Sequence, residues 1–298
     1  MCVRFFTVST FNCSHHTPMN APDLTEPTAI QGGSRVVAHH SYRLRTLTAH
    51  NDALVVVLRG TKQLMSPTQT LTIPAGQAVM MAAGTTWDVV NDPNGHSRYE
   101  ALLLAFEPEW VQAMSGLDGP RPLQAIGHAR VLHTDAPLLE AVQRTLGQAV
   151  SARVLQHRIQ EVLLWLAERG WTYAPRHGRP WPDRVRQLVA QRPDADWSAP
   201  ALAAVFHTSE STLRRRLEDA HLPLATLVRD TRLEVALGLL QTTSLSVGDV
   251  AQRCGWASHS RFSAAFQARW GVSPRLVRGP SAPAHTLADL AQTLTESG

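Results

Sequence analysis

The stretch VGDVAQRCGWASHSRFSAAFQARWGVSP, residues 247–274, decides the fold of the C-terminal part of the chain. It predicts a short apolar helix, a turn that contains glycine and a second helix that carries arginine. Ser258 is a good N-cap for the second helix, and Phe262 and Phe266 lie one helical turn apart and give that helix an apolar face. This order of elements is typical of a helix-turn-helix unit.

The same pattern occurs a second time in the chain. The stretch LAAVFHTSESTLRRRLEDAHLPL, residues 202–224, aligns with residues 250–272 after a gap of one residue in the turn. The alignment places Ser209 over Ser258. It also places apolar residues over apolar residues, Leu213 over Phe262 and Leu217 over Phe266. The repeat predicts two helix-turn-helix units, each with a capped second helix whose other faces point outward.

Between the two units lies LATLVRDTRLEVALGLLQTTSLS, residues 224–246, which predicts one amphipathic helix. Four residues would form its apolar side: Leu227, Thr231, Val235 and Leu239. About 18 helical residues span roughly 27 Å, which is close to the ~34 Å between successive major-groove faces of B-DNA. Two recognition helices on one rigid spacer could therefore enter adjacent grooves from one side of a duplex.

The charge of the chain is unevenly distributed. Residues 181–280 hold 13 Arg against 9 Asp and Glu, and the whole chain carries a net charge of +4. Because the rest of the chain is balanced, all of the basic excess lies in one third of it, which favours a polyanion as the partner of that third. A solvated basic surface without a partner is the alternative.

The segment from Arg232 to Pro274 resembles the signature of AraC/XylS-type transcription regulators. The resemblance covers the C-terminal third of the chain. It rests on Arg232-Leu233, Ala236, Leu239-Leu240, Val250-Ala251, Gly255-Trp256, Ser258, Phe262, Phe266 and the closing Gly271-Val272-Ser273-Pro274. It implies a DNA-binding transcription regulator, an activator in its usual form, with double-stranded promoter DNA and RNA polymerase as partners and a homodimer as the assembly.

The resemblance also implies which side chains contact DNA. Ser211, Arg214 and Arg215 of the first recognition helix would face bases or nearby phosphates. Neighbours on a helix are about 100° apart, so three successive arginines cannot all face one groove, and we expect Arg216 to pack or to contact a phosphate. The candidate DNA-binding residues are Ser209, Ser211, Arg214, Arg215, Ser258, His259, Ser260 and Arg261.

Two positions depart from the family's pattern. His207 stands where the first turn usually has glycine, so that turn is expected to be packed more tightly or to be slightly remodelled. Ala264 stands where the second recognition helix often carries an arginine directed at DNA. We therefore expect the first unit to be the principal reader of sequence.

The N-terminal half reads as short β-rich runs from residue 35 to 107, separated by turn residues, which favours an antiparallel barrel or sandwich. Two helices follow, from Ala136 to Gly170, and their apolar stripes predict a dimer contact or a brace for the linker, with packing within the monomer as the alternative. Three stretches, ALVVVLRGTKQL at 53–64, IPAGQAVMMAAGTTWDVV at 73–90 and EALLLAFEPEW at 100–110, resemble more loosely the cupin-like sensor common in the same family. The predicted fold class is α+β. The predicted domains are a sensor at 35–171, a linker at 172–181, the DNA-binding domain at 182–280 and a tail at 281–298.

The interior of the predicted barrel favours a small apolar effector over a metal. Metal-binding cupins use two His separated by one residue, and no such pair occurs, since His39 and His40 are adjacent and face opposite sides of a strand. Val56, Leu58 and Trp87 are the candidate effector-binding residues, and the alternative is that the other faces of these strands line the cavity. We expect no cofactor, no metal and no enzymatic activity. Two alternatives stay open: a cupin-type metal oxygenase or isomerase with a DNA-binding tail, and a barrel that serves only for dimer contacts.

Composition supports a folded protein, with 44% apolar and 17% charged residues. No run approaches the ~18 apolar residues of a membrane span, so we expect no membrane association. Residues 1–34 are expected to be disordered or to contain a wrongly assigned start, in which case Met19 is the true start and residues 1–18 are not native. Cys254 would then be the only thiol, which fits a reducing cytoplasm.

Overall fold

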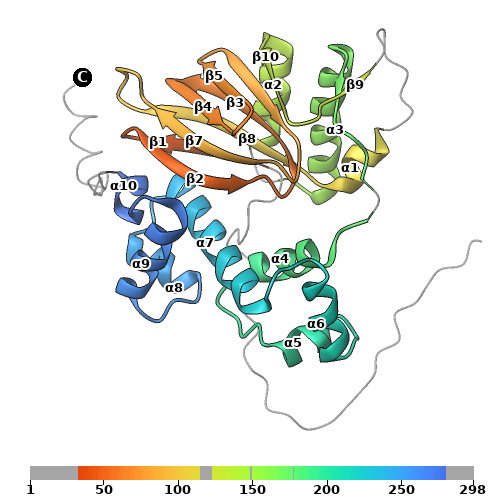
Figure 1. Cartoon of the computed structure of the whole chain (residues 1–298). Coiled ribbons are helices and arrows are strands. Elements are labelled where there is room, and N and C mark those ends of the chain that lie inside the picture. The colour runs from red at the N-terminus through yellow and green to blue at the C-terminus, as the bar shows by residue number, and fades with distance from the viewer. Residues whose placement is uncertain (1–32, 115–122, 148–149, 177, 280–298) are drawn as a thin grey trace, which may run out of the picture.

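The computed structural model of the chain describes residues 33–114, 123–147, 150–176 and 178–279 (Figure 1). The expectations for residues 1–32, for the start at Met19 and for the tail at 281–298 lie outside these ranges. Within them a β-rich domain with trailing helices precedes an all-helical domain, so the predicted α+β fold class is confirmed. None of the described helices is both long enough and apolar enough to cross a membrane.

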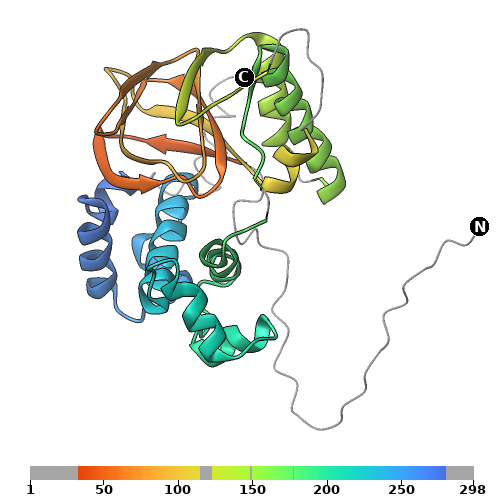
Figure 2. The ribbon, with the colours of Figure 1, turned by 45° about the vertical axis from the view of Figure 1, so that its right-hand side comes forward.

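Two antiparallel sheets form the N-terminal domain, and Figure 2 shows them facing each other. The first sheet has the strand order β1 (Gly33–Ala38), β8 (Tyr99–Phe106), β3 (Asp52–Arg59), β6 (Gln77–Met81) and β10 (Ala129–His133). The second has the order β2 (Tyr42–Thr48), β7 (Thr86–Asp92), β4 (Thr61–Met65) and β5 (Thr70–Pro74). Sequence reasoning missed β1 and β10, and it placed Gly33 and Ser34 outside the fold although both belong to β1.

The first sheet is buried on both faces, because β3 alternates between two cores. Val55 and Val57 face the second sheet. Leu54 and Val56 face the helices on the other side, α1 (Pro108–Ala113), α2 (Ala136–Thr145) and α3 (Ala152–Glu168). The apolar residues predicted along these helices are mostly buried in this second core. Leu138, Val142, Ile159, Val162 and Leu166 are at most 1% exposed. Packing within the monomer therefore satisfies much of these stripes, and the dimer contact through these helices stays a prediction.

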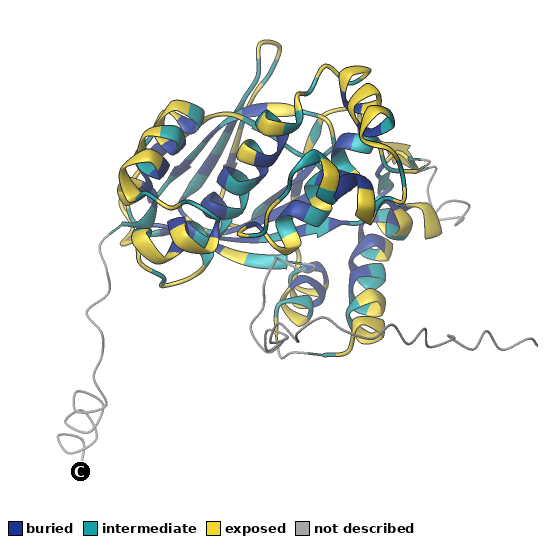
Figure 3. Cartoon of the chain, turned by 90° about the horizontal axis from the view of Figure 1, so that it is seen from below, coloured by how far each residue is buried: buried dark blue, intermediate teal, exposed yellow. Residues whose placement is uncertain are grey.

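The C-terminal domain is helical throughout, as predicted. Its helices are α4 (Trp181–Gln191), α5 (Ala199–Val205), α6 (Glu210–Glu218), α7 (Leu224–Thr242), α8 (Val247–Arg253), α9 (His259–Trp270) and α10 (Pro274–Arg278). Helices α5 and α6 form the first helix-turn-helix unit and α8 and α9 the second, joined by α7 (Figure 1). Figure 3 shows that the helices turn their buried residues inward and their exposed residues outward.

The two units are packed differently. The first unit has a separate core, built from α4, α5, α6 and the first half of α7. The core of the second unit is continuous with the interior of the barrel. The predicted apolar side of α7 is therefore only half right. Leu227 and Thr231 are buried, but Val235 and Leu239 are only partly so, because the second half of α7 buries Leu233, Ala236, Leu237 and Leu240 instead.

The segment predicted as a linker is tied to the N-terminal domain over its first part. Trp171–Thr172 forms strand β11, which pairs in parallel with β9 (Gln124–Ala125). The next residue, Tyr173, is 2% exposed, and its hydroxyl donates to the backbone oxygen of Ala53 over 2.7 Å. Helix α4 then begins at Trp181.

Candidate functional site

The recognition helices α6 and α9 are built alike. The side-chain oxygen of Ser209 accepts a hydrogen bond from the backbone N–H of Thr212 over 3.2 Å, and Ser258 accepts one from Arg261 over 3.4 Å. Both serines are therefore N-caps, as predicted. The apolar anchors of both helices are at most 3% exposed: Leu213, Leu217, Phe262 and Phe266. The anchors fix which face of each helix is left outward.

The turns of the two units have the same backbone conformation with different residues. His207 in the first turn has φ of 51°, and Gly255 at the equivalent place in the second has φ of 74°. A Cβ on Gly255 would lie 2.8 Å from the backbone oxygen of Pro193. The first turn therefore keeps the family's geometry with a non-glycine residue in the left-handed region, which costs conformational energy.

The outer face of α6 is basic. Ser211, Arg214 and Arg215 are exposed, and within the described residues the side chains of the two arginines form no ion pair or hydrogen bond. The guanidinium carbon of Arg216 lies 6.0 Å from the centre of the Trp181 ring. Helix α6 thus presents two unengaged arginines at one face, and Arg216 is turned toward α4.

The outer face of α9 carries fewer donors. His259, Ser260 and Arg261 are exposed at its start, and the exposed Ala264 one turn later offers no hydrogen-bond donor. Arg269 at the other end of α9 faces the barrel, where its Nη1 donates to the hydroxyl of Thr46 over 3.1 Å. The structure thus brings the predicted residues of each unit onto one exposed helix face, richer in charge on α6 than on α9.

The predicted effector residues do not line one space. Trp87 lies between the sheets, 1% exposed, and its Nε1 donates to the hydroxyl of Thr85 over 2.9 Å. Val56 and Leu58 lie on the other face of β3, against α2 and α3. Successive residues of a strand alternate between faces, and it is the alternate face of β3, with Val55 and Val57, that lies with Trp87 between the sheets. The three residues cannot form one effector site.

A polar layer inside the barrel escaped the sequence reasoning. Tyr42, Asn91 and Lys62 lie side by side across β2, β7 and β4, with Leu44, Val89 and Leu64 in the next layer. Nζ of Lys62 donates to Oδ1 of Asn91 over 2.9 Å. Lys62 is 7% exposed and no described acidic side chain pairs with it, so its charge is buried without a counter-ion.

The electrostatics of this layer follow from burial. Burial lowers the pKa of Lys62 to about 8 and raises the pKa of Tyr42 and of Tyr99. The hydroxyl of Tyr99 is buried without a hydrogen-bond partner among the described residues. The hydroxyl of Tyr42 accepts a hydrogen bond from Nε2 of Gln241 on α7 over 2.9 Å, so the layer reaches the C-terminal domain.

The sequence did contain a signal for this layer. Lys62 is the only lysine among the 28 basic residues, all others being arginine. Alternation in β4 places it on the same inward face as Leu64. A lysine can give up its proton when buried, whereas an arginine keeps its charge, so the single lysine stands at the one basic position that is inside the barrel.

The described residues hold no group of three or more His, Cys, Asp or Glu side chains arranged to bind a metal ion. Nε2 of His50 pairs instead with Oε1 of Glu234 on α7 over 2.9 Å. Cys254 is buried, and burial raises the pKa of its thiol to about 12. The thiol is therefore protonated and unreactive at neutral pH.

Two capped recognition helices with exposed basic faces, joined by one long helix, define a double helix-turn-helix DNA-binding domain. Residues 202–279 match the family model described as a helix-turn-helix domain. The predicted resemblance of this domain to AraC/XylS-type transcription regulators is confirmed.

Curated relatives agree with this class. The urease operon transcriptional activator of Escherichia coli is 30% identical over 94 residues, which are 32% of this chain and 32% of that protein. The HTH-type transcriptional regulator YdeO of Escherichia coli K12 is 31% identical over 94 residues, 32% of this chain and 37% of that protein. The DNA-binding dual transcriptional regulator Rns of Escherichia coli is 29% identical over 93 residues, 31% and 35% of the two chains. The chain thus matches about a third of the length of these relatives.

The fold of the whole chain has a counterpart among solved structures. An apo form of ToxT from Vibrio cholerae matches with a TM-score of 0.55 at 14% identity, over 81% of this chain and 94% of that chain. ToxT with an unsaturated fatty acid bound matches with a TM-score of 0.51 at 13% identity, over 82% and 92% of the two chains. At these identities the likeness shows a shared fold.

Proposed function

We propose that the chain is a sequence-specific transcription regulator of the AraC/XylS type that binds promoter DNA and is controlled by a small-molecule effector in its N-terminal domain. The observation that carries the proposal is the repeated helix-turn-helix unit on one 19-residue helix, with exposed, unpaired arginines on the first recognition helix. The resemblance further supports a homodimer in the cytoplasm that acts with RNA polymerase. The regulator needs no catalytic activity and no cofactor for this role.

The two units divide the work of DNA binding. Arg214 and Arg215 are the residues able to donate paired hydrogen bonds to guanine, and Ser211 lies beside them. His259, Ser260 and Arg261 at the start of α9 contact phosphates or base edges with fewer donors. Ser209 and Ser258 fix the N-terminal ends of the two helices toward the duplex.

The effector in this proposal is a small organic acid with an apolar body. Its carboxylate would supply the counter-ion that Lys62 lacks, and the hydroxyl of Tyr99 would supply a further donor. Its apolar part would lie among the residues between the sheets, which include Trp87. The ToxT structure with a bound unsaturated fatty acid supports an acid of this kind in a protein of the same fold.

The test of DNA binding starts with selection of duplexes from a random pool by the full chain. Titrations on the selected and on a scrambled duplex at several salt concentrations should give tighter binding of the selected one by at least about 10³-fold. Equal affinity for both duplexes would contradict sequence-specific binding. The variant with both Arg214→Ala and Arg215→Ala should retain salt-dependent binding and lose most of this ratio.

The effector is tested on the single lysine. Protein labelled with ¹³C-lysine gives one lysine side-chain NMR signal, whose pH titration reports the pKa of Lys62. Saturated and unsaturated fatty acids of several lengths are the probes, with matched alcohols as controls. A bound carboxylate should raise this pKa by about 1 unit or more, and the alcohols should not. An acid that binds the chain equally well after Lys62→Met would refute the assignment.

A further inference from the structure

Two turns at one end of the barrel are joined to each other. The turn from Ala49 to Asp52 connects β2 to β3, and the turn from Ala82 to Thr85 connects β6 to β7, so each passes from one sheet to the other. The backbone N–H of Ala49 donates to the oxygen of Thr85 over 2.9 Å, and that of Gly84 donates to the oxygen of Ala49 over 2.7 Å. Any change in the spacing of the two sheets must move both turns together.

The interior of the barrel is connected to this pair of turns. Nε1 of Trp87, between the sheets, donates to the hydroxyl of Thr85, and that hydroxyl donates to the backbone oxygen of Ala82 over 2.6 Å. Oδ1 of Asp52 accepts a hydrogen bond from the N–H of Ala83 over 2.8 Å. Hydrogen bonds thus join the two turns to each other and to Trp87 in the core.

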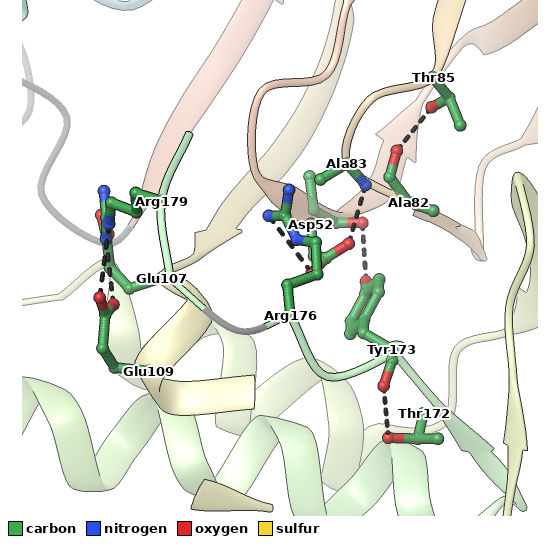
Figure 4. Close-up of polar contacts among 11 residues, drawn as sticks. Asp52, Ala82, Ala83, Thr85, Glu107, Glu109, Thr172, Tyr173, Arg176 and Arg179 are labelled. Carbon is green, nitrogen blue, oxygen red and sulfur yellow. Dashed lines mark hydrogen bonds and ion pairs between the residues drawn. The ribbon is translucent and has the colours of Figure 1, made fainter. Parts of the chain in front are cut away.

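Contacts to the C-terminal half start at the same turns, and Figure 4 shows those between Asp52 and Arg176 and from Tyr173. His50 binds Glu234, which lies in the middle of α7, over 2.9 Å. Asp52 faces Arg176 at 3.8 Å between Oδ2 and Nη2, and Ala53, the residue that follows the turn, accepts the hydrogen bond from Tyr173. One turn therefore holds both the central helix of the DNA-binding domain and the segment that leads into it.

The segment after Tyr173 continues the connection to the first unit. Arg179 pairs with Glu107 and with Glu109 at the start of α1, and α4 begins two residues later. Helix α4 packs against α7 and shares the core of the first helix-turn-helix unit. Movement of the turns would therefore reach the first unit along the chain and both units through α7.

We propose that these paired turns, residues 49–53 and 82–85, are the coupling element that transmits a change inside the barrel to the DNA-binding domain. The proposal rests on the proposed function, because it assigns a route for the control that the effector exerts. Within residues 50–53, three polar contacts reach two separate parts of the C-terminal half, α7 and the segment 173–176. Simple packing of the barrel would not require such a concentration of contacts.

The contact between Asp52 and Arg176 is suited to such a role. Asp52 is 3% exposed, yet its Oδ2 and the Nε and Nη2 of Arg176 are buried without hydrogen-bond partners among the described residues. Burial also raises the pKa of the Asp52 carboxyl. At 3.8 Å the two groups attract each other but do not form a hydrogen bond, so a small shift of the turn toward Arg176 would add the missing hydrogen bonds and strengthen the contact.

Linkage provides a test that needs no effector. If the turns couple the two domains, the coupling is reciprocal. A conformation of the turns that favours DNA binding must itself be favoured, by the same free energy, when DNA is bound at α6 and α9. Amide hydrogen exchange of the full chain is measured with and without the selected duplex, in peptides that cover residues 82–87. We expect the duplex to change exchange there by about fivefold or more, although these residues lie in the other domain.

Variants show whether the named contacts carry the effect. Glu234→Gln and Arg176→Gln, singly and together, should bind the duplex and reduce the change in exchange at residues 82–87, with the double variant abolishing it. Arg144→Gln is the matched control, because it breaks an ion pair with Glu161 between α2 and α3, and it should behave as the wild type. Circular dichroism confirms that each variant is folded. If the double variant does not fold, the comparison of the two single variants with the wild type serves as the test.

The outcomes separate the two proposals. Exchange at residues 82–87 that is the same with and without a tightly bound duplex overturns the coupling element and leaves the proposed function in place. A double variant in which the duplex changes exchange at residues 82–87 as much as in the wild type also overturns the coupling element. A chain that binds no duplex with preference overturns the proposed function, and the coupling proposal falls with it.

Discussion

Replacing Lys62 tests the account of the barrel interior most directly. Lys62→Met keeps the length of the side chain and removes the charge. The pKa of Lys62 is lowered from 10.5 to about 8 by burial. Keeping the ammonium group charged inside the folded protein at pH 7 therefore costs about 3 kcal/mol, at about 1.4 kcal/mol for each unit of pKa. Part of this gain on substitution is lost because Asn91 loses its hydrogen-bond donor.

The pH dependence of stability isolates the effect of the charge. A lowered pKa means that the folded protein releases the proton at a lower pH than the unfolded chain does, so the free energy of unfolding rises with pH between about 8 and 10.5. For these two pKa values, linkage gives the wild type a gain of about 1.3 kcal/mol between pH 7 and pH 9, relative to Lys62→Met. The destabilisation from the buried charge is fully present below pH 8 and fades above it.

Urea unfolding of both proteins at pH 7, 8 and 9, followed by far-UV circular dichroism, measures this difference. All other titrating groups are common to the two proteins and cancel in the comparison. Two stability profiles that run parallel from pH 7 to pH 9 would refute the account, because they would mean that Lys62 titrates alike in the folded and unfolded chains. The ¹³C-lysine titration then gives the pKa of Lys62 independently.

Other expected results concern the helix-turn-helix units and the sensor core. His207→Gly should raise the free energy of unfolding by about 0.5–1 kcal/mol, since glycine adopts the left-handed conformation without strain, whereas Gly255→Ala should lower it by about 2 kcal/mol; urea unfolding measures both. Arg215→Ala should cost about 1–3 kcal/mol of discrimination at one base pair, and Arg261→Ala should weaken binding to all duplexes and reduce the salt slope by about one unit; titrations that gave the reverse pattern would make the second unit the principal reader. Val142→Asp should destabilise the chain by at least about 3 kcal/mol without a change of subunit number in sedimentation, because that side chain is 0% exposed inside the monomer.

The C-terminal domain could be predicted from the sequence because its signals are local. A serine N-cap with apolar residues one turn apart specifies a capped helix by itself, and the repetition of Ser209 and Leu213 as Ser258 and Phe262 confirms each copy by the other. The turn at His207 is different, because its change from glycine predicted a remodelled turn, whereas His207 adopts the left-handed conformation of Gly255 at the aligned position.

The core of the N-terminal domain could be predicted only in part, because it depends on which face of each strand turns inward. β3 is apolar on both faces, so its sequence gives no alternation by which to assign Val56 to one core or the other. In β4 the alternation was present, yet a lysine among the inward residues runs against the usual rule that charged side chains stay outside. The ties from His50 to Glu234 and from Tyr173 to Ala53 join residues far apart in the chain and carry no local signal at all.

The packing of the two units limits how the sensor domain can act on DNA binding. The barrel shares its core with the second unit and holds Arg269, yet Ser260 and Arg261 at the start of α9 remain exposed, as do Arg214 and Arg215 on α6. The barrel therefore does not cover either recognition face. Because the second unit is joined to the barrel while the first has its own core, the proposed control by an effector would act by altering the placement of one unit relative to the other. Two recognition helices bind adjacent grooves only when their spacing and direction match the duplex, so a change of placement is sufficient to control binding.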